Sequence, residues 1–418
     1  MTSRSSVQRP ANSALLTLAA LAVALFWAIE GIDVNDPQVE RVAILVGAIV
    51  LGWLALRGWS WAPGLTAYLA ILVAISERLR REPLLDGSDV LRATTESLVI
   101  VSKGGNPYAA CLQSTVPPCS PLVYPPGELA WYAIPQWLFG DITRVDTWAG
   151  VLIVVALALT GLRTGFEVAA LPSMLYASWG IAGYRAIDGS NDVSASALVV
   201  FACVALVLAR PPDQRPSLRA HDVVFLLSAA LFGWAIAFKQ FSLLILPPVA
   251  RWLAVSGARW RCYTLVALGV TAAFCLPFFL RDPLAFFDDQ FKALTFHEEI
   301  WGTNLLNTMK HFGDPQALLP MFALIEIFGT LALVTVASWR WRPSSLGAAV
   351  LAGAGVVMFA LLFAKWTTQP YYAYVGGIVA AGLALVSVTA GESRSPSPAD
   401  PYGSVTTAPG SGPRGRPA

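Results

Sequence analysis

DGSDVLRATTESLVIVSKGGNPYAACLQSTVPPCSPLVYPPGE, residues 86–128, is a polar, proline-punctuated stretch in a chain that is otherwise almost entirely apolar. Of the 418 residues, 56% are hydrophobic and 13% are charged, whereas soluble proteins carry about a quarter charged residues. The composition predicts an all-α, polytopic membrane protein. Carboxylates kept in a polar insert of such a protein serve chemistry or recognition more often than packing.

Apolar runs recur on both sides of this insert. A helix needs about 20 apolar residues to cross the bilayer, and the runs lie at 13–29, 42–56, 62–76, 127–139, 147–163, 167–184, 194–209, 222–238, 241–255, 262–280, 316–338, 345–364 and 371–390. The run at 127–139 is short, contains Pro135 and is rich in Trp and Tyr, so we expect an interfacial helix there. About twelve transmembrane helices remain.

The positions of Lys and Arg predict the orientation, because short cytoplasmic loops accumulate these residues. Basic segments at 210–219, 251–261 and 340–342 indicate the cytoplasmic side. The polar insert 77–146 and the segment 281–315 then lie outside, and both termini lie inside. The cluster of Arg78, Arg80 and Arg81 opposes this assignment, since it falls on the outer side.

The domain organisation follows from the same pattern. Residues 1–390 are predicted to form a single transmembrane domain. Residues 391–418 are rich in Pro, Gly and Ser and cannot bury a core, so we expect a disordered cytoplasmic tail.

Two of the five cysteines, Cys111 and Cys119, lie in the outer insert, eight positions apart. An oxidising compartment would let them pair. The residues leave a disulfide and two free thiols equally open.

Several signatures of soluble enzymes are missing from the sequence. It contains no GxxxxGK[ST], HExxH or GxSxG motif, so ATP-driven transport and hydrolase chemistry lose support. We expect no nucleic-acid partner.

A series of weak motifs follows the outer face in a fixed order: SDVLRATTESL, GGNPY, YPPGELAWYAIP, GSND, FKQFSLLILPP and KWTTQPYY, over about residues 86–372. Their order resembles GT-C fold glycosyltransferases, and is most similar to family 87, the polyprenol-phosphate-mannose type. The resemblance implies a GT-C fold in a bacterial plasma membrane. It also implies transfer of a sugar, mannose by preference, from a polyprenyl-phosphate donor to an extracytoplasmic lipid or glycan acceptor. Leu91 and Arg92 depart from the family, whose members often have an aromatic residue shortly after the acid.

Such a transfer needs a base that takes the acceptor proton. Asp89 matches the acid of the family and is the first candidate, and Asp86 is the second. The alternative role of Asp89 is a helix cap, because Asp is a favoured residue before a helix.

The leaving phosphate needs a cation near the membrane boundary. Lys239 is the main candidate, because an ionisable residue between two apolar runs is costly, and Gln240 supports the same phosphate. Lys365, Arg185 and Arg281 are weaker alternatives. The alternative for Lys239 is a side chain that extends to the lipid head groups.

Further substrate-binding candidates come from the remaining motifs: Asn106, Tyr108, Tyr124, Asn191, Asp192 and Tyr371. Loop turns and helix caps are the competing roles for the Asn and Asp residues. No cofactor is required by the sequence. Carboxylates could hold a divalent metal, although no spacing demands one.

Two other functions stay open at this point. A transporter or flippase would also combine many helices with outward polar groups, but predicts charges in the middle of spans. Glu326 is the one clear example. A noncatalytic subunit that binds lipid-linked sugars would use the same residues without the base.

Overall fold

A computed structural model describes residues 59–79, 81–84, 88–209, 218–295 and 300–388, together with positions 50, 54 and 57. Within these ranges the chain is almost wholly helical. The α-helices are α3 (Ala62–Leu79), α4 (Val90–Ser102), α5 (Gly127–Phe139), α6 (Val145–Thr164), α7 (Phe166–Ser178), α8 (Gly180–Arg185), α9 (Asp192–Leu208), α10 (Leu218–Phe238), α11 (Leu246–Val255), α12 (Trp260–Arg281), α13 (Pro283–Thr295), α14 (Leu305–Thr308), α15 (Leu319–Leu324), α16 (Thr330–Thr335), α17 (Leu346–Phe363) and α18 (Gln369–Ala384).

Shorter elements connect these helices. The 3₁₀ turns are η1 (Pro107–Ala109), η2 (Gln240–Leu244), η3 (Met309–His311) and η4 (Pro315–Leu318), and the π-helical turns are η5 (Ile325–Gly329) and η6 (Val336–Arg340). Strands β1 (Trp301–Gly302) and β2 (Trp366–Thr367) pair in parallel.

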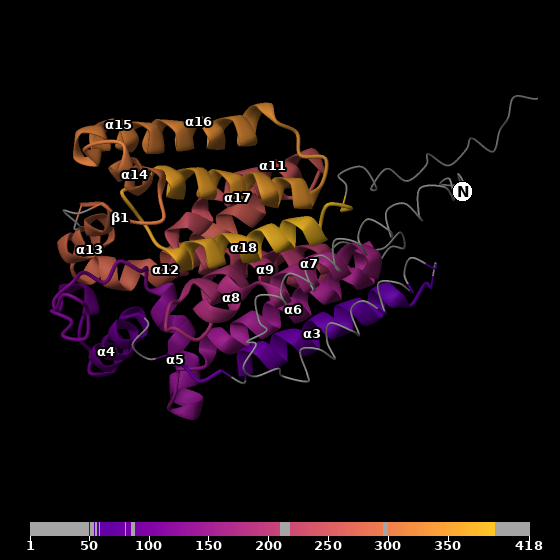
Figure 1. Cartoon of the computed structure of the whole chain (residues 1–418), viewed down its shortest axis with the longest axis horizontal. Helices are drawn as coiled ribbons and strands as arrows, with labels where there is room; N and C mark the ends of the chain where they lie inside the picture. Colours follow the sequence, from indigo (N-terminus) through magenta and orange to yellow (C-terminus); the bar gives the residue numbers. More distant parts are fainter. Residues whose placement is uncertain are drawn as a thin grey trace, which may run out of the picture.

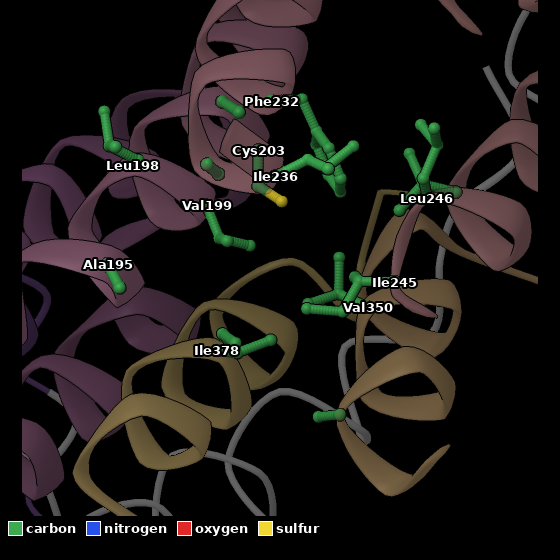
Figure 2. Packing of buried hydrophobic residues seen from close by; sticks show 14 of the residues in the cluster. Ala195, Leu198, Val199, Cys203, Phe232, Ile236, Ile245, Leu246, Val350 and Ile378 are labelled. Carbon is green, nitrogen blue, oxygen red and sulfur yellow. The ribbon is translucent and has the colours of Figure 1, made fainter. Parts of the chain in front are cut away.

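Helix α9 is the centre of the bundle and packs against α6, α10 and α18. Its sequence is rich in Ala, Ser and Val, and such small side chains let neighbouring helices approach closely. Figure 2 shows Cys203 of α9 close to Ile236 of α10, and Val199 between this pair and Ile378 of α18, within one large apolar cluster.

Four helices of the described part are long and apolar enough to cross a membrane, by length and composition: Val145–Thr164, Trp260–Arg281, Pro315–Arg340 and Leu346–Phe363. Five further apolar helices are shorter: Ala62–Ser76, Val168–Ala177, Asp192–Leu208, Asp222–Phe238 and Gln240–Val255. The prediction of about twelve spans is therefore not confirmed.

The sequence missed two causes of this difference. The run at 167–184 is divided at Trp179, and the run at 241–255 opens with a 3₁₀ turn. The runs at 13–29 and 42–56, the tail 391–418 and Asp86 lie wholly or mostly outside the described residues.

Arg78 explains part of the conflict in the charge pattern. Its side chain is fully buried, and its two terminal nitrogens donate to the carbonyls of Tyr176 and Ala177, each at 3.2 Å. Those carbonyls belong to the last turn of α7, where the helix dipole favours a cation. Arg78 thus caps a helix and does not act as a loop charge.

The two segments predicted to lie outside meet at one end of the bundle. Figure 1 shows α4, α13, β1 and α14 gathered at the left end of the molecule. The Leu122 N–H donates to Asp289 of α13 at 3.0 Å, and the Gln290 amide donates to the Leu122 carbonyl at 3.3 Å. The insert and the later segment therefore form one polar layer.

Candidate functional site

Lys239 is the buried cation of the candidate site. It lies where α10 ends and η2 begins, with an extended backbone, and is only 1% exposed. Its ammonium lies 2.5 Å from Asp192 Oδ1 and 3.4 Å from Asn191 Oδ1. A buried charge is tolerated only when it is paired in this way.

Three tyrosines surround the same ammonium. The ring centroids of Tyr124, Tyr371 and Tyr374 lie 5.2, 4.5 and 5.9 Å from Lys239 Nζ. Aromatic faces attract a cation electrostatically. Tyr374 is fixed by a 2.8 Å hydrogen bond between its hydroxyl and that of Ser242. Segments before α5 and on α18 thus build one aromatic enclosure.

Glu128 is a second buried acid beside this pair, with no exposed surface. Its Oε1 accepts from Asn191 Nδ2 at 2.7 Å and from the Thr94 hydroxyl at 2.9 Å. Burial raises the pKa of Glu128 to about 7, against the opposing effects of these hydrogen bonds and of Lys239.

The YPPGE motif explains how Glu128 reaches this position. A Cβ atom on Gly127 would lie 2.5 Å from the carbonyl carbon of Ala237, so only glycine permits this contact between α5 and α10. Trp234 Nε1 also donates to the Gly127 carbonyl at 2.8 Å. The start of α5 is held against the end of α10, next to Lys239.

Asp89 precedes α4, but its side chain does not cap that helix. Its Oδ2 instead accepts from the Val116 N–H at 2.9 Å. Burial, and then neighbouring acidic groups that include Asp192, Glu128 and Asp89, raise the pKa of the Tyr124 phenol well above its ordinary value. Asp89 therefore lies within electrostatic reach of the Lys239 enclosure.

The loop that holds Asp89 is itself tethered. A disulfide between Cys111 and Cys119 closes this loop, which contains Val116. Glu96 of α4 accepts from the Gln113 and Ser114 N–H groups at 3.0 and 2.9 Å. The carboxylates of Asp89, directly before α4, and Glu96, on α4, thus both bind backbone N–H groups of the loop closed by the disulfide.

Tyr108 contacts the site through the backbone of Tyr124, and Asn106 contacts the backbone of Tyr108. Asn106 Oδ1 accepts from the Tyr108 N–H at 3.2 Å, as in a local cap. The Tyr108 ring is 3% exposed, and its hydroxyl donates to the Tyr124 carbonyl at 2.9 Å. Their placement supports the Tyr124 backbone and leaves little of the Tyr108 ring open to a ligand.

A second cation, Arg185, lies at the edge of the group. It pairs with Asp188, and its other terminal nitrogen donates to Gln369 Oε1 at 2.8 Å. By contrast, no hydrogen bond or ion pair among the described residues joins the side chains of Lys365 or Gln240 to the Lys239 group. Gln240 is exposed.

The structure thus brings Asn191, Asp192, Lys239, Tyr124 and Tyr371 together, with Asp89 nearby. Sequence reasoning missed Glu128, Thr94 and Tyr374. Glu128 did carry a signal, because it is an acid in the first turn of an apolar helix, where a charge is costly unless it has a role.

Within the described part of the chain, no group of three or more His, Cys, Asp or Glu residues is placed to hold a metal ion.

Comparisons with known proteins gave structural matches alone. No family profile and no curated protein sequence matches the chain. ArnT from Cupriavidus metallidurans bound to undecaprenyl phosphate superimposes with a TM-score of 0.47 at 18% identity, over 77% of this chain and 59% of ArnT. Its apo state gives the same score and identity, over 79% and 60%.

The oligosaccharyltransferase of Archaeoglobus fulgidus, in complex with Zn and sulfate, gives a TM-score of 0.45 at 16% identity, over 77% of this chain and 48% of that one. The chain therefore spans about half to three fifths of the length of these structures.

Proposed function

We propose that this chain is a membrane glycosyltransferase that moves a sugar from a polyprenyl-phosphate donor to an extracytoplasmic lipid or glycan acceptor. The convergence of the motifs supports the proposal. Segments 88–95, 124–128, 188–192, 239–242 and 369–374 are far apart in sequence, yet they contact one another around the Lys239–Asp192 pair. These are the segments that carry the GT-C resemblance, and mannose is the sugar it favours.

Asp89 is the proposed general base. Among the described residues only the Val116 N–H donates to its carboxylate, and that bond uses Oδ2. Oδ1 can therefore accept the proton of the acceptor hydroxyl. The acceptor oxygen then bonds to the anomeric carbon, and the bond from that carbon to the phosphate oxygen breaks. Polyprenyl phosphate leaves with the electron pair.

The donor phosphate is proposed to bind at the tyrosines around Lys239. Tyr124 and Tyr371 are half-buried, whereas Lys239 is 1% exposed. Their phenols can donate to phosphate oxygens, while the ammonium supplies positive charge from within 5.2 Å of both ring centroids. Arg185, at the edge of the group, adds a second positive charge. Charge that is fixed in advance stabilises the leaving phosphate without using a proton.

The test is sugar transfer by purified protein in nanodiscs, with radiolabelled polyprenyl-phosphate mannose and a membrane lipid extract. We expect labelled product from the wild type and from Asp141→Asn, which changes an exposed acid at the end of α5. Asp89→Asn should give none and remain folded, because an amide oxygen can still accept from the Val116 N–H.

The other outcomes separate the alternatives. Donor binding without product from the wild type would contradict the proposal and indicate a noncatalytic binder. Movement of labelled donor across a liposome membrane, again without product, would indicate a flippase.

A further inference from the structure

Glu128 links the two halves of the proposed site. Its Oε1 accepts from Thr94 of α4, the helix that begins directly after Asp89. The same oxygen accepts from Asn191, whose own Oδ1 faces Lys239 Nζ at 3.4 Å. A continuous chain of polar contacts therefore runs from the helix of the proposed base to the buried cation, through one carboxyl group.

The surroundings of this carboxyl cost less for its neutral form, which leaves one buried O–H without an acceptor among the described residues, than for its ionised form. Both donors to Oε1 are uncharged groups, a hydroxyl and an amide. Oε2 is buried and has no hydrogen-bond partner among the described residues. An ionised carboxylate accepts hydrogen bonds on both oxygens, and burying it without a direct cationic contact is costly.

We propose that Glu128 is a positioning residue that works as a neutral carboxylic acid, holding Asn191 and α4 so that Lys239 and Asp89 keep a fixed separation. This inference rests on the proposed function for its kinetic consequences. It does not rest on that function for the protonation state.

Some of the groups that face Glu128 favour its protonated form, and others favour its ionised form. Asp146 of α6 favours the protonated form, and Lys239 at the end of α10 opposes it. Asp192, next to Asn191 in sequence, is paired with Lys239. The charge of Glu128 raises the pKa of the phenols of Tyr108, Tyr124 and Tyr132. Burial is the largest influence and raises the pKa to about 7.

The kinetic test compares substitutions that keep or remove the oxygen atom of residue 128 that accepts from Thr94 and Asn191. Glu128→Gln keeps an oxygen acceptor for both donors, so kcat should stay within about threefold of the wild type. Glu128→Ala removes the acceptor, and kcat should fall about 100-fold, since a displacement near 1 Å costs that much. Thr94→Val should also lower kcat, with KM for the donor less affected, and Thr94→Ser should restore it.

The pH profile gives a readout that a merely structural role would not move. Above about pH 7 the wild type should lose activity as Glu128 ionises, and Glu128→Gln should lack this alkaline limb. If Glu128→Gln lost transfer as severely as Glu128→Ala, an ionised carboxylate at position 128 would be required and the proposal would be overturned.

Infrared spectroscopy tests the protonation state without any activity. Wild type at about pH 6 should show the carbonyl band of a protonated carboxyl that Glu128→Gln lacks and that Asp146→Asn retains. The band should disappear when the pH is raised to about 9. Absence of the band in wild type would overturn the neutral state. Its presence in a protein that transfers no sugar would overturn the proposed function and leave the neutral Glu128 in place.

Discussion

Asp89 and Asn191 each occupy the position before a helix, yet neither side chain caps it. The Asp89 carboxylate binds the N–H of Val116, and the Asn191 amide bridges Glu128 and Lys239. Asn106, by contrast, does accept from a backbone N–H at the start of its own turn. A residue that is suited to capping and does not cap is available for another role, which strengthens the first two as site residues.

The Lys239–Asp192 pair predicts a stability pattern. Lys239→Met should destabilise the protein by about 3–5 kcal/mol, because it leaves a buried carboxylate unpaired. The double variant Lys239→Met, Asp192→Asn should recover most of that loss, since no charge remains. Thermal unfolding in detergent measures both. Equal stability of the single variant and the wild type would show that the pair is not buried.

Glu128 also predicts how stability depends on pH. Its pKa in the folded protein, about 7, lies above the model-peptide value of 4.5. The folded state therefore holds a proton that the unfolded state releases between these values, and stability falls as pH rises through this window. The loss is on the order of 3 kcal/mol. Glu128→Gln should flatten this part of the curve, and an unchanged slope would contradict the assignment.

The packing of helix α5 determines where Glu128 lies. The sequence predicted an interfacial helix at 127–139, and α5 has these bounds. It did not predict the close approach of Gly127 to Ala237 at the end of α10, because these residues lie 110 positions apart in sequence. Glu128 is therefore a site residue for a tertiary reason that no local pattern contains.

Gly127→Ala tests this contact. The added methyl would lie 2.5 Å from the Ala237 carbonyl carbon, so α5 must move away from α10 at a cost of about 1–3 kcal/mol. We expect lower stability and a large loss of transfer. Gly269→Ala is the matched control, since a Cβ there meets nothing within 4 Å. If the two variants behaved alike in unfolding and transfer assays, the close approach would be unimportant.

Elements were predictable where hydropathy alone determines them. Five of the six apolar runs between residues 194 and 364 coincide with α9, α10, α12, the Pro315–Arg340 helix and α17, and the sixth, at 241–255, is divided between η2 and α11. The break at Trp179 was not predictable from the run at 167–184. There the indole lies where a side chain on Gly376 would stand, so a distant glycine on α18 makes room for the break.

At the scale of the whole molecule, the two ends of the bundle differ in chemistry. The polar layer, the disulfide and the Lys239 group share one end, and the basic segments 251–261 and 340–342 lie toward the other. Sequence reasoning placed the motifs on one face because charge and hydropathy alternate along the chain. It could not rank residues within that face, since ranking depends on burial.

The orientation can be tested with single cysteines at the two ends of the Pro315–Arg340 helix, after Cys203, Cys262 and Cys275 are replaced. Gly313 and Ser344 are both exposed. We expect a membrane-impermeant maleimide to label Gly313→Cys in intact cells and Ser344→Cys only after permeabilisation. The reverse labelling would invert the topology and place the site on the cytoplasmic side.

Tyr371 and Tyr374 belong to α18, whereas the lysine that they enclose lies more than a hundred positions earlier. Proteins are made from the N-terminus, and the earlier parts of a chain generally fold first during synthesis. The Lys239–Asp192 pair is therefore synthesised before α18, and its enclosure stays incomplete until residue 374 has left the ribosome. A chain released before that point carries the proposed base, the cation and Tyr124 but lacks Tyr371 and Tyr374, so the enclosure around Lys239 is completed only at the end of synthesis.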